Sequence, residues 1–234
     1  MLVTHGTDTL EETAFFLEQV LPPALLQAKP LVLTCAMRPA SALTPDGPQN
    51  VLDAVAVALD GAARGVLVVC AGAVHSARLV QKSYTYRVDA FDSGDAGPLA
   101  LVEEARVRWL GNPAPVASPH TVALQALANT PWPRVEIVMN YAGASGAMVR
   151  SLAAPDAAVS PLRGLVVAGT GNGTLHVDLE AALLALQAQG VAVVRASRCA
   201  RGQVVAGEGA AALPHSQGLS PVKARIALML QLMA

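Results

Sequence analysis

Short apolar runs alternate with segments of helical apolar spacing along most of the chain. In the first half, runs typical of buried strands cover residues 2–4, 30–35 and 65–70, while helical spacing covers residues 9–27 and 50–59. Strands that alternate with helices at this interval are typical of a parallel sheet, because each parallel connection needs a crossover segment. The pattern therefore predicts an α/β fold in which helices flank a largely parallel sheet.

The alternation is interrupted over residues 111–133 and then starts again. Proline is dense in this interval, and few continuous helices or strands tolerate that density. We therefore predict a linker at 111–133, a larger N-terminal domain at 1–110 and a smaller C-terminal domain at 134–234. The elements predicted for the second domain are strands at 135–140, 165–168 and 191–196 and helices at 145–152, at 178–189 and from Pro221 onward.

Composition and charge narrow the range of partners. With 234 residues, of which 53% are hydrophobic, the chain can bury substantial cores. The formal net charge is −1 and lysine and arginine do not cluster, so we predict no nucleic-acid partner. The longest apolar runs are far shorter than the roughly 20 residues that a membrane span requires, so we also predict no membrane partner.

The cysteines and histidines give no sign of a metal site. Cys35, Cys70 and Cys199 are odd in number and widely spaced, and the first two end apolar runs, where buried structural thiols usually lie. The histidines are scattered, without the spacing of metal ligands. We therefore predict neither a disulfide nor a bound metal.

Candidate chemistry appears where the first strand gives way to the first helix, at Thr7 and Asp8. The carboxyl ends of strands in an open α/β sheet face the binding crevice, and a helix N-terminus attracts anionic groups. The same residues also fit an ordinary helix cap, with Asp8 followed by Glu11 or Thr9 followed by Glu12. Spacing alone leaves both interpretations open.

Residues 5–14, His-Gly-Thr-Asp-Thr-Leu-Glu-Glu-Thr-Ala, resemble the second of two signature segments of the bacterial asparaginase/glutaminase family. The resemblance implies an amidohydrolase that converts L-asparagine to L-aspartate and ammonia through a threonine acyl-enzyme, without a cofactor. L-Glutamine is the alternative substrate, and a homo-oligomer, either a dimer or a tetramer, is implied. The similarity continues through residues 36–40, 46–50, 72–78, 89–93, 169–173 and 223–225.

In that family the matching threonine and aspartate form a triad with a lysine, which corresponds here to Thr7, Asp8 and Lys82. A threonine hydroxyl is a weak nucleophile, but a neutral lysine amine beside it can accept its proton while the aspartate orients that amine. The resemblance also implies that Thr7 and Asp8 contact the substrate, with Asp8 binding its α-amino group. Without the resemblance, Lys82 would be interpreted as a surface lysine.

A glycine cluster at residues 169–173 invites a dinucleotide-binding interpretation, which fails because the third glycine of that motif is replaced by Thr174. The glycines instead indicate a tight turn with positive φ angles. By resemblance, this loop reaches a neighbouring subunit's site, where Thr174 matches a substrate-contacting asparagine or serine. Glu208 is a candidate for the acid that a neighbouring subunit contributes in exported members.

Family members open with a glycine-rich Thr-Gly-Gly-Thr-Ile-Ala-like segment whose first threonine is the usual nucleophile, and this sequence contains no such segment. The resemblance therefore predicts an incomplete N-terminal domain. It also predicts impaired or absent activity, because loss of a covalent nucleophile costs several orders of magnitude in rate.

Two other functions stay open. One is a catalytically dead amino-acid-binding protein, and the other is the asparaginase-like subunit of a tRNA-dependent amidotransferase. The compartment is open as well. The lack of a leader after Met1 favours the cytoplasm, but an export signal for the periplasm would lie upstream of that residue.

Overall fold

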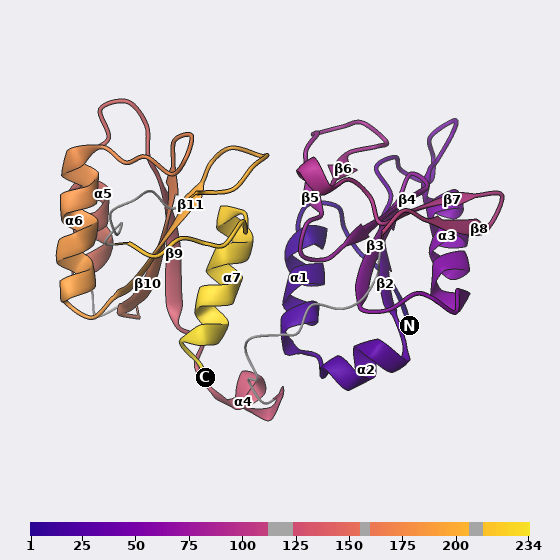
Figure 1. Ribbon diagram of the computed structural model, residues 1–234, viewed down its shortest axis with the longest axis horizontal. Helices are drawn as coiled ribbons and strands as arrows, with labels where there is room; N and C mark the ends of the chain where they lie inside the picture. Colours follow the sequence, from indigo (N-terminus) through magenta and orange to yellow (C-terminus); the bar gives the residue numbers. More distant parts are fainter. Residues whose placement is uncertain (112–123, 155–159, 206–212) are drawn as a thin grey trace. The chain divides into compact units, whose positions relative to one another are not determined.

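The computed structural model describes residues 1–111, 124–154, 160–205 and 213–234 (Figure 1). The chain divides into two compact units, residues 1–121 and 122–234, which are described separately. Each unit combines a sheet with flanking helices, and the first has the larger sheet, so the prediction of a two-part α/β fold is confirmed. In the described part of the interval predicted as a linker, residues 124–129 form a short helix, α4 (Leu124–Asn129).

A six-stranded sheet in the order β1-β2-β3-β4-β7-β8 forms the centre of the first unit. Its first three strands are parallel, and every residue of β2 and β3 is buried, as expected for strands covered on both faces. The other three strands are antiparallel. The bounds are β1 (Leu2–Thr4), β2 (Leu31–Thr34), β3 (Val66–Cys70), β4 (Ala73–Ser76), β7 (Ala100–Glu103) and β8 (Arg106–Trp109).

The antiparallel half of this sheet was not predicted from the sequence. The turn between β7 and β8 is formed by Glu104 and Ala105, whose φ angles are 49° and 59°. Tight hairpin turns with two positive φ angles usually contain Asn-Gly or Asp-Gly, so a Glu-Ala pair carries no recognisable turn signal.

Helices cover both faces of the first sheet. Helices α1 (Leu10–Val20) and α2 (Pro23–Ala28) pack on the face that carries Leu33 and Val68. Helix α3 (Gly47–Leu59) packs on the opposite face. The prediction of one helix over residues 9–27 is wrong, because the proline pair at 22 and 23 ends the first helix and starts a second one.

A small two-stranded sheet follows β4 in the chain and supplies a site residue. It pairs β5 (Gln81–Lys82) with β6 (Phe91–Asp92), so that Lys82 lies opposite Phe91. A short 3₁₀ turn, η1 (Gly94–Ala96), comes next. These strands are too short to produce a recognisable apolar alternation in the sequence.

The second unit has a three-stranded parallel sheet in the order β11-β10-β9. Helices α5 and α6 pack on one face and α7 on the other. The strands and helices predicted for this domain are confirmed, with small shifts at their ends. Their bounds are β9 (Arg134–Met139), α5 (Ala147–Ala153), β10 (Leu162–Gly169), α6 (Val177–Ala188), β11 (Ala192–Ser197) and α7 (Pro221–Gln231).

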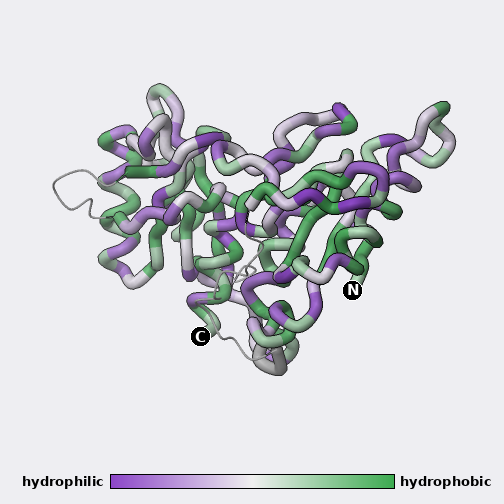
Figure 2. Tube along the Cα trace, turned by 45° about the vertical axis from the view of Figure 1, so that its right-hand side comes forward, coloured by the Kyte–Doolittle hydropathy of each residue, from purple (hydrophilic) through white to green (hydrophobic). Residues whose placement is uncertain are grey.

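Hydropathy follows this layering within each unit. Along the trace in Figure 2, green hydrophobic stretches alternate with white and purple ones in both units, and the residues of β2 and β3 are all buried. Within the described parts of the chain, no helix is both long and apolar enough to cross a membrane.

Candidate active site

Thr7 and Asp8 lie in the turn that joins β1 to α1, at the carboxyl end of the parallel strands. The pairing of β1 with β2 continues past Thr4, because the His5 backbone N–H donates to the Thr34 carbonyl at 2.9 Å. Helix α1 then begins after Thr9. The turn thus presents a hydroxyl and a carboxylate at the sheet edge where ligands bind in open α/β folds.

The His5 ring connects this turn to α1 through two hydrogen bonds. Its Nδ1 lies 2.7 Å from the Gly6 carbonyl oxygen, and its Nε2 lies 3.0 Å from the Thr13 hydroxyl. A carbonyl oxygen only accepts, so in the neutral ring Nδ1–H donates to Gly6 and Nε2 accepts from Thr13. Spacing along the sequence gives no sign of the contact between His5 and Thr13, because it depends on the geometry of the turn.

Lys82 brings the predicted triad together from the β5–β6 hairpin. Its Nζ donates to Thr7 Oγ1 at 2.8 Å and to Asp8 Oδ1 at 2.7 Å. The Thr7 hydroxyl also lies 3.4 Å from Asp8 Oδ1. The lysine side chain is only 17% exposed, whereas that of Asp8 is 93% exposed, so the carboxylate is open to a ligand.

The electrostatics of the cluster centre on the Lys82–Asp8 ion pair. The hydrogen bond from Lys82 and then its positive charge hold the pKa of Asp8 below its usual value. Because Asp8 is exposed, the ion pair adds little to the stability of the fold. Its effect is to orient the Lys82 amine. Once Lys82 loses a proton, its amine is close enough to Thr7 Oγ1 to accept the hydroxyl proton, as nucleophile activation requires.

The helix-cap interpretation of this segment is wrong. Thr9 occupies the cap position, but its side chain makes no capping hydrogen bond. The Asp8 carboxylate pairs with Lys82 instead, and a Glu11 carboxylate oxygen lies 3.5 Å from the Lys82 backbone nitrogen. Asp8 and Glu11, the two acids of the proposed cap, therefore both lie next to Lys82.

Hydrogen bonds join the two ends of the loop over residues 37–46, next to the carboxyl end of β2. Burial raises the pKa of Asp46, but hydrogen bonds from the Met37 and Arg38 backbone N–H groups and from Asn50 outweigh it and lower that pKa. The Arg38 guanidinium donates to the carbonyl and hydroxyl oxygens of Thr44. Arg38 therefore supports its own loop.

Thr174 belongs to the second unit, in the loop that follows β10. Thr170 and Thr174 exchange two backbone hydrogen bonds, and Gly171 and Gly173 have φ angles of 50° and 78°, which confirms the predicted tight turn. The Asn140 amide donates to the Thr174 carbonyl at 3.2 Å, and the Thr174 residue is exposed. Glu208 lies outside the described residues.

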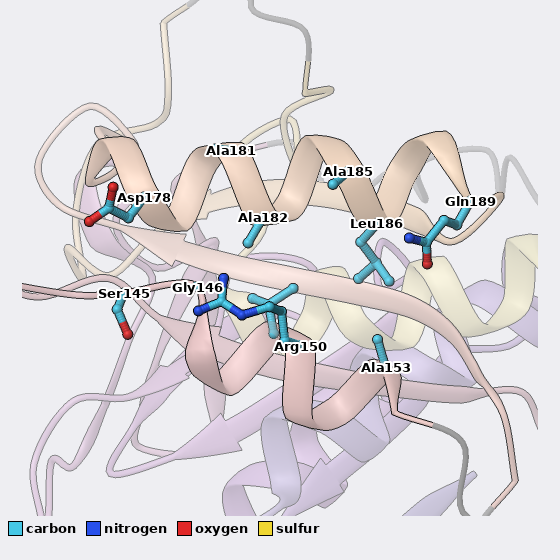
Figure 3. A pocket seen from close by; sticks show the side chains of 11 residues that line it. Ser145, Gly146, Arg150, Ala153, Asp178, Ala181, Ala182, Ala185, Leu186 and Gln189 are labelled. Atoms are coloured by element: carbon cyan, nitrogen blue, oxygen red, sulfur yellow. The ribbon is translucent and has the colours of Figure 1, made fainter.

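The second unit also contains a cavity of about 610 Å³ between α5 and α6. Small side chains of both helices line it, and Arg150 extends from α5 toward α6 in Figure 3. The cavity belongs to a different unit from Lys82. Within the described ranges, no group of three or more histidine, cysteine, aspartate or glutamate side chains is arranged to hold a metal ion.

Fold and site together define a two-unit α/β protein with a threonine–lysine–aspartate cluster at the carboxyl edge of a parallel sheet. The family model described as "Asparaginase, N-terminal" matches residues 1–115, and the model described as "Glutaminase/Asparaginase C-terminal domain" matches residues 134–234. The chain belongs to the asparaginase family, which confirms the resemblance seen in the sequence.

Individual relatives extend over nearly the whole chain. L-asparaginase 2 of Escherichia coli is 37% identical, with 99% of this chain and 65% of the relative covered. The glutaminase-asparaginase of Pseudomonas fluorescens is 36% identical, with 99% and 63% covered. The chain therefore spans just under two thirds of the length of these two curated relatives.

A solved relative supports the fold at the level of the backbone. The crystal structure of the probable cytoplasmic L-asparaginase from Campylobacter jejuni matches with a TM-score of 0.85 and 35% identity. The match covers 99% of this chain and 72% of that structure.

Proposed function

We propose that the protein is an amidohydrolase that converts L-asparagine and water to L-aspartate and ammonia. The observation that carries the proposal is the double contact of Lys82 Nζ, at 2.8 Å from Thr7 Oγ1 and 2.7 Å from Asp8 Oδ1. The names of the relatives, L-asparaginase and glutaminase-asparaginase, support the substrate class. L-Glutamine is the alternative substrate.

In the proposed reaction, a threonine hydroxyl attacks the side-chain amide carbonyl, ammonia leaves, and water then hydrolyses the acyl-enzyme. The family resemblance assigns the attack to the threonine of the glycine-rich segment, which is not part of this sequence. Lys82 then accepts a proton from the Thr7 hydroxyl, and the Thr7 oxygen takes up a proton from that nucleophile or from the water, while Asp8 holds the amine in place.

Asp8 has a second role in the proposal, as the receptor for the α-ammonium group of the substrate. Its carboxylate is 93% exposed while one of its oxygens is held by Lys82, so a ligand can approach it without displacing the lysine. Thr174 and Glu208 are proposed to contact the substrate from a neighbouring subunit. This arrangement implies a homo-oligomer, either a dimer or a tetramer.

Ammonia release from L-asparagine tests the proposal directly. The assay compares the 234-residue chain with a version extended upstream to include the glycine-rich threonine segment, each with a Thr7→Val control. We expect little or no release by the short chain and release by the extended chain that Thr7→Val abolishes. Valine removes the hydroxyl while keeping a similar side-chain volume, so a loss reflects chemistry.

Other outcomes favour the alternatives. Release by the short chain that Thr7→Val abolishes would make Thr7 itself the nucleophile. Saturable binding of aspartate without release from either form would favour a catalytically dead amino-acid-binding protein. Co-purification with a tRNA-dependent partner enzyme would favour the amidotransferase subunit. We also propose a cytoplasmic location, supported by the name of the Campylobacter jejuni relative and testable by cell fractionation.

A further inference from the structure

Two thiols lie side by side at the carboxyl ends of β2 and β3. The Sγ atoms of Cys35 and Cys70 are 3.4 Å apart, and the residues are only 6% and 2% exposed. The parallel pairing of β2 with β3 sets Thr34 opposite Val69, so the next pair in register is Cys35 and Cys70. Adjacent strands are about 4.8 Å apart, which lies within the roughly 4.4–6.8 Å between Cα atoms that a disulfide requires.

The two thiols are not equivalent. The hydrogen bond between the two sulfurs lowers the pKa of Cys35. Burial and the Asp46 carboxylate raise this pKa, whereas the Lys82 ammonium lowers it further. The same hydrogen bond, together with burial, raises the pKa of Cys70. Cys35 is also the more exposed of the two. Since the thiolate is the reactive form of cysteine, the lowered pKa favours Cys35 as the sulfur that reacts with an oxidant.

We propose that Cys35 and Cys70 form a redox-sensitive dithiol that hydrogen peroxide oxidises to a disulfide. The Cys35 thiolate attacks one peroxide oxygen, the O–O bond breaks, and Cys35 sulfenic acid and hydroxide form. The Cys70 sulfur then attacks the Cys35 sulfur, the S–O bond breaks, and water leaves. In total, two thiols are oxidised and one peroxide is reduced, which yields one disulfide and two waters.

Hydrogen bonds to one buried side chain hold the backbone on both sides of the pair. The Asn50 amide donates to the Cys35 carbonyl at 2.9 Å, and its oxygen accepts from the Ala71 backbone N–H at 2.9 Å. Both strand ends are thus tied to one buried side chain. The sulfurs therefore need to close from 3.4 Å to about 2.05 Å mainly by side-chain rotation.

The location of the pair links it to the β1–α1 turn. Cys35 directly follows Thr34, whose carbonyl holds the His5 backbone N–H at the start of that turn. The sulfurs also belong to the same buried cluster as Leu10 and Ala14 of α1. The proposed disulfide would therefore form in the core cluster that α1 packs on, although its formation does not depend on amide hydrolysis.

Peptide mapping of the peroxide-treated chain under non-reducing conditions tests the proposal. We expect a cross-linked peptide pair containing Cys35 and Cys70, an intact-mass loss of two hydrogen atoms, and recovery of both thiols with dithiothreitol. Cys199→Ser is the matched control, because Cys199 is exposed and lies in the other unit, so the cross-link should persist in that variant. In Cys70→Ser we expect Cys35 sulfenic acid that dimedone labels.

Peptide mapping of the unmodified sequence tests the Cys35–Cys70 disulfide even if a variant fails to fold. Oxidation of Cys199 with Cys35 and Cys70 recovered as free thiols would overturn the proposal. So would a cross-link that joins Cys199 to either partner, or one that disappears in Cys199→Ser.

Discussion

Asp8 and Lys82 give the site a titration behaviour that can be measured one residue at a time. The hydrogen bond and charge of Lys82 lower the pKa of Asp8 from the usual value of 3.8. Because the folded-state pKa is the lower one, the ion pair is intact above the usual value and is lost as pH falls through the lowered pKa. In Lys82→Met we expect the Asp8 carboxyl to titrate close to its usual pKa, as followed by carbon NMR.

Lys29→Met is the control for this titration. Lys29 is an exposed lysine that follows α2 in the same unit, so its loss should leave the Asp8 titration unchanged. An Asp8 pKa that stays low in Lys82→Met would contradict the ion pair as its cause.

Thr7, Asp8 and Lys82 could be predicted from the sequence only through the family resemblance, because their spacing does not reveal that they lie together. Lys82 and Thr7 are 75 positions apart, and no local pattern relates them. His5 and Thr13 lie inside the signature segment itself. Their hydrogen bond, however, depends on which nitrogen of the His5 ring lies next to the Thr13 hydroxyl. Side-chain direction of this kind follows from tertiary structure.

At the scale of elements, the buried parallel strands were predictable and the antiparallel ones were not. Strand β3 is a continuous apolar run and β2 is apolar up to Thr34, because both of their faces are covered by helices. Strand β8 alternates exposed and half-buried residues over only four positions, and β5 has two residues. Such short segments carry too little pattern to be recognised, although one of them places Lys82.

Gly169 at the end of β10 offers a stability test of the loop that carries Thr174. A Cβ added at Gly169 would lie 2.5 Å from the Gly173 backbone, which cannot move aside as a flexible side chain could. We expect Gly169→Ala to lower the free energy of unfolding by about 1–3 kcal/mol, as overpacking does. Denaturant unfolding measures the change.

Gly61→Ala provides the matched control. A Cβ at Gly61 meets nothing within 4 Å, and the residue is exposed. Its unfolding free energy should therefore change by less than about 0.5 kcal/mol. Equal effects of the two substitutions would show that the tight packing of Gly169 against Gly173 is not the cause.

For the whole molecule, the two units have separate cores and the proposed site residues are divided between them. Thr7, Asp8 and Lys82 belong to the first unit and Thr174 to the second. The proposed pairing of such half-sites between subunits requires self-association. We expect light scattering during gel filtration to give the mass of a dimer or tetramer, and a monomer at micromolar concentration would contradict it.

The most direct measurement is the rate of ammonia release from L-asparagine by Lys82→Met, made in the upstream-extended form and compared with Lys29→Met. A single atom of Lys82, its Nζ, contacts both Thr7 and Asp8. Positioned acid–base groups typically contribute a factor of about 10² to 10⁴ in rate, so Lys82→Met should lose at least about a hundredfold. Lys29→Met should keep the full rate. An undiminished rate in Lys82→Met would contradict the role proposed for the triad.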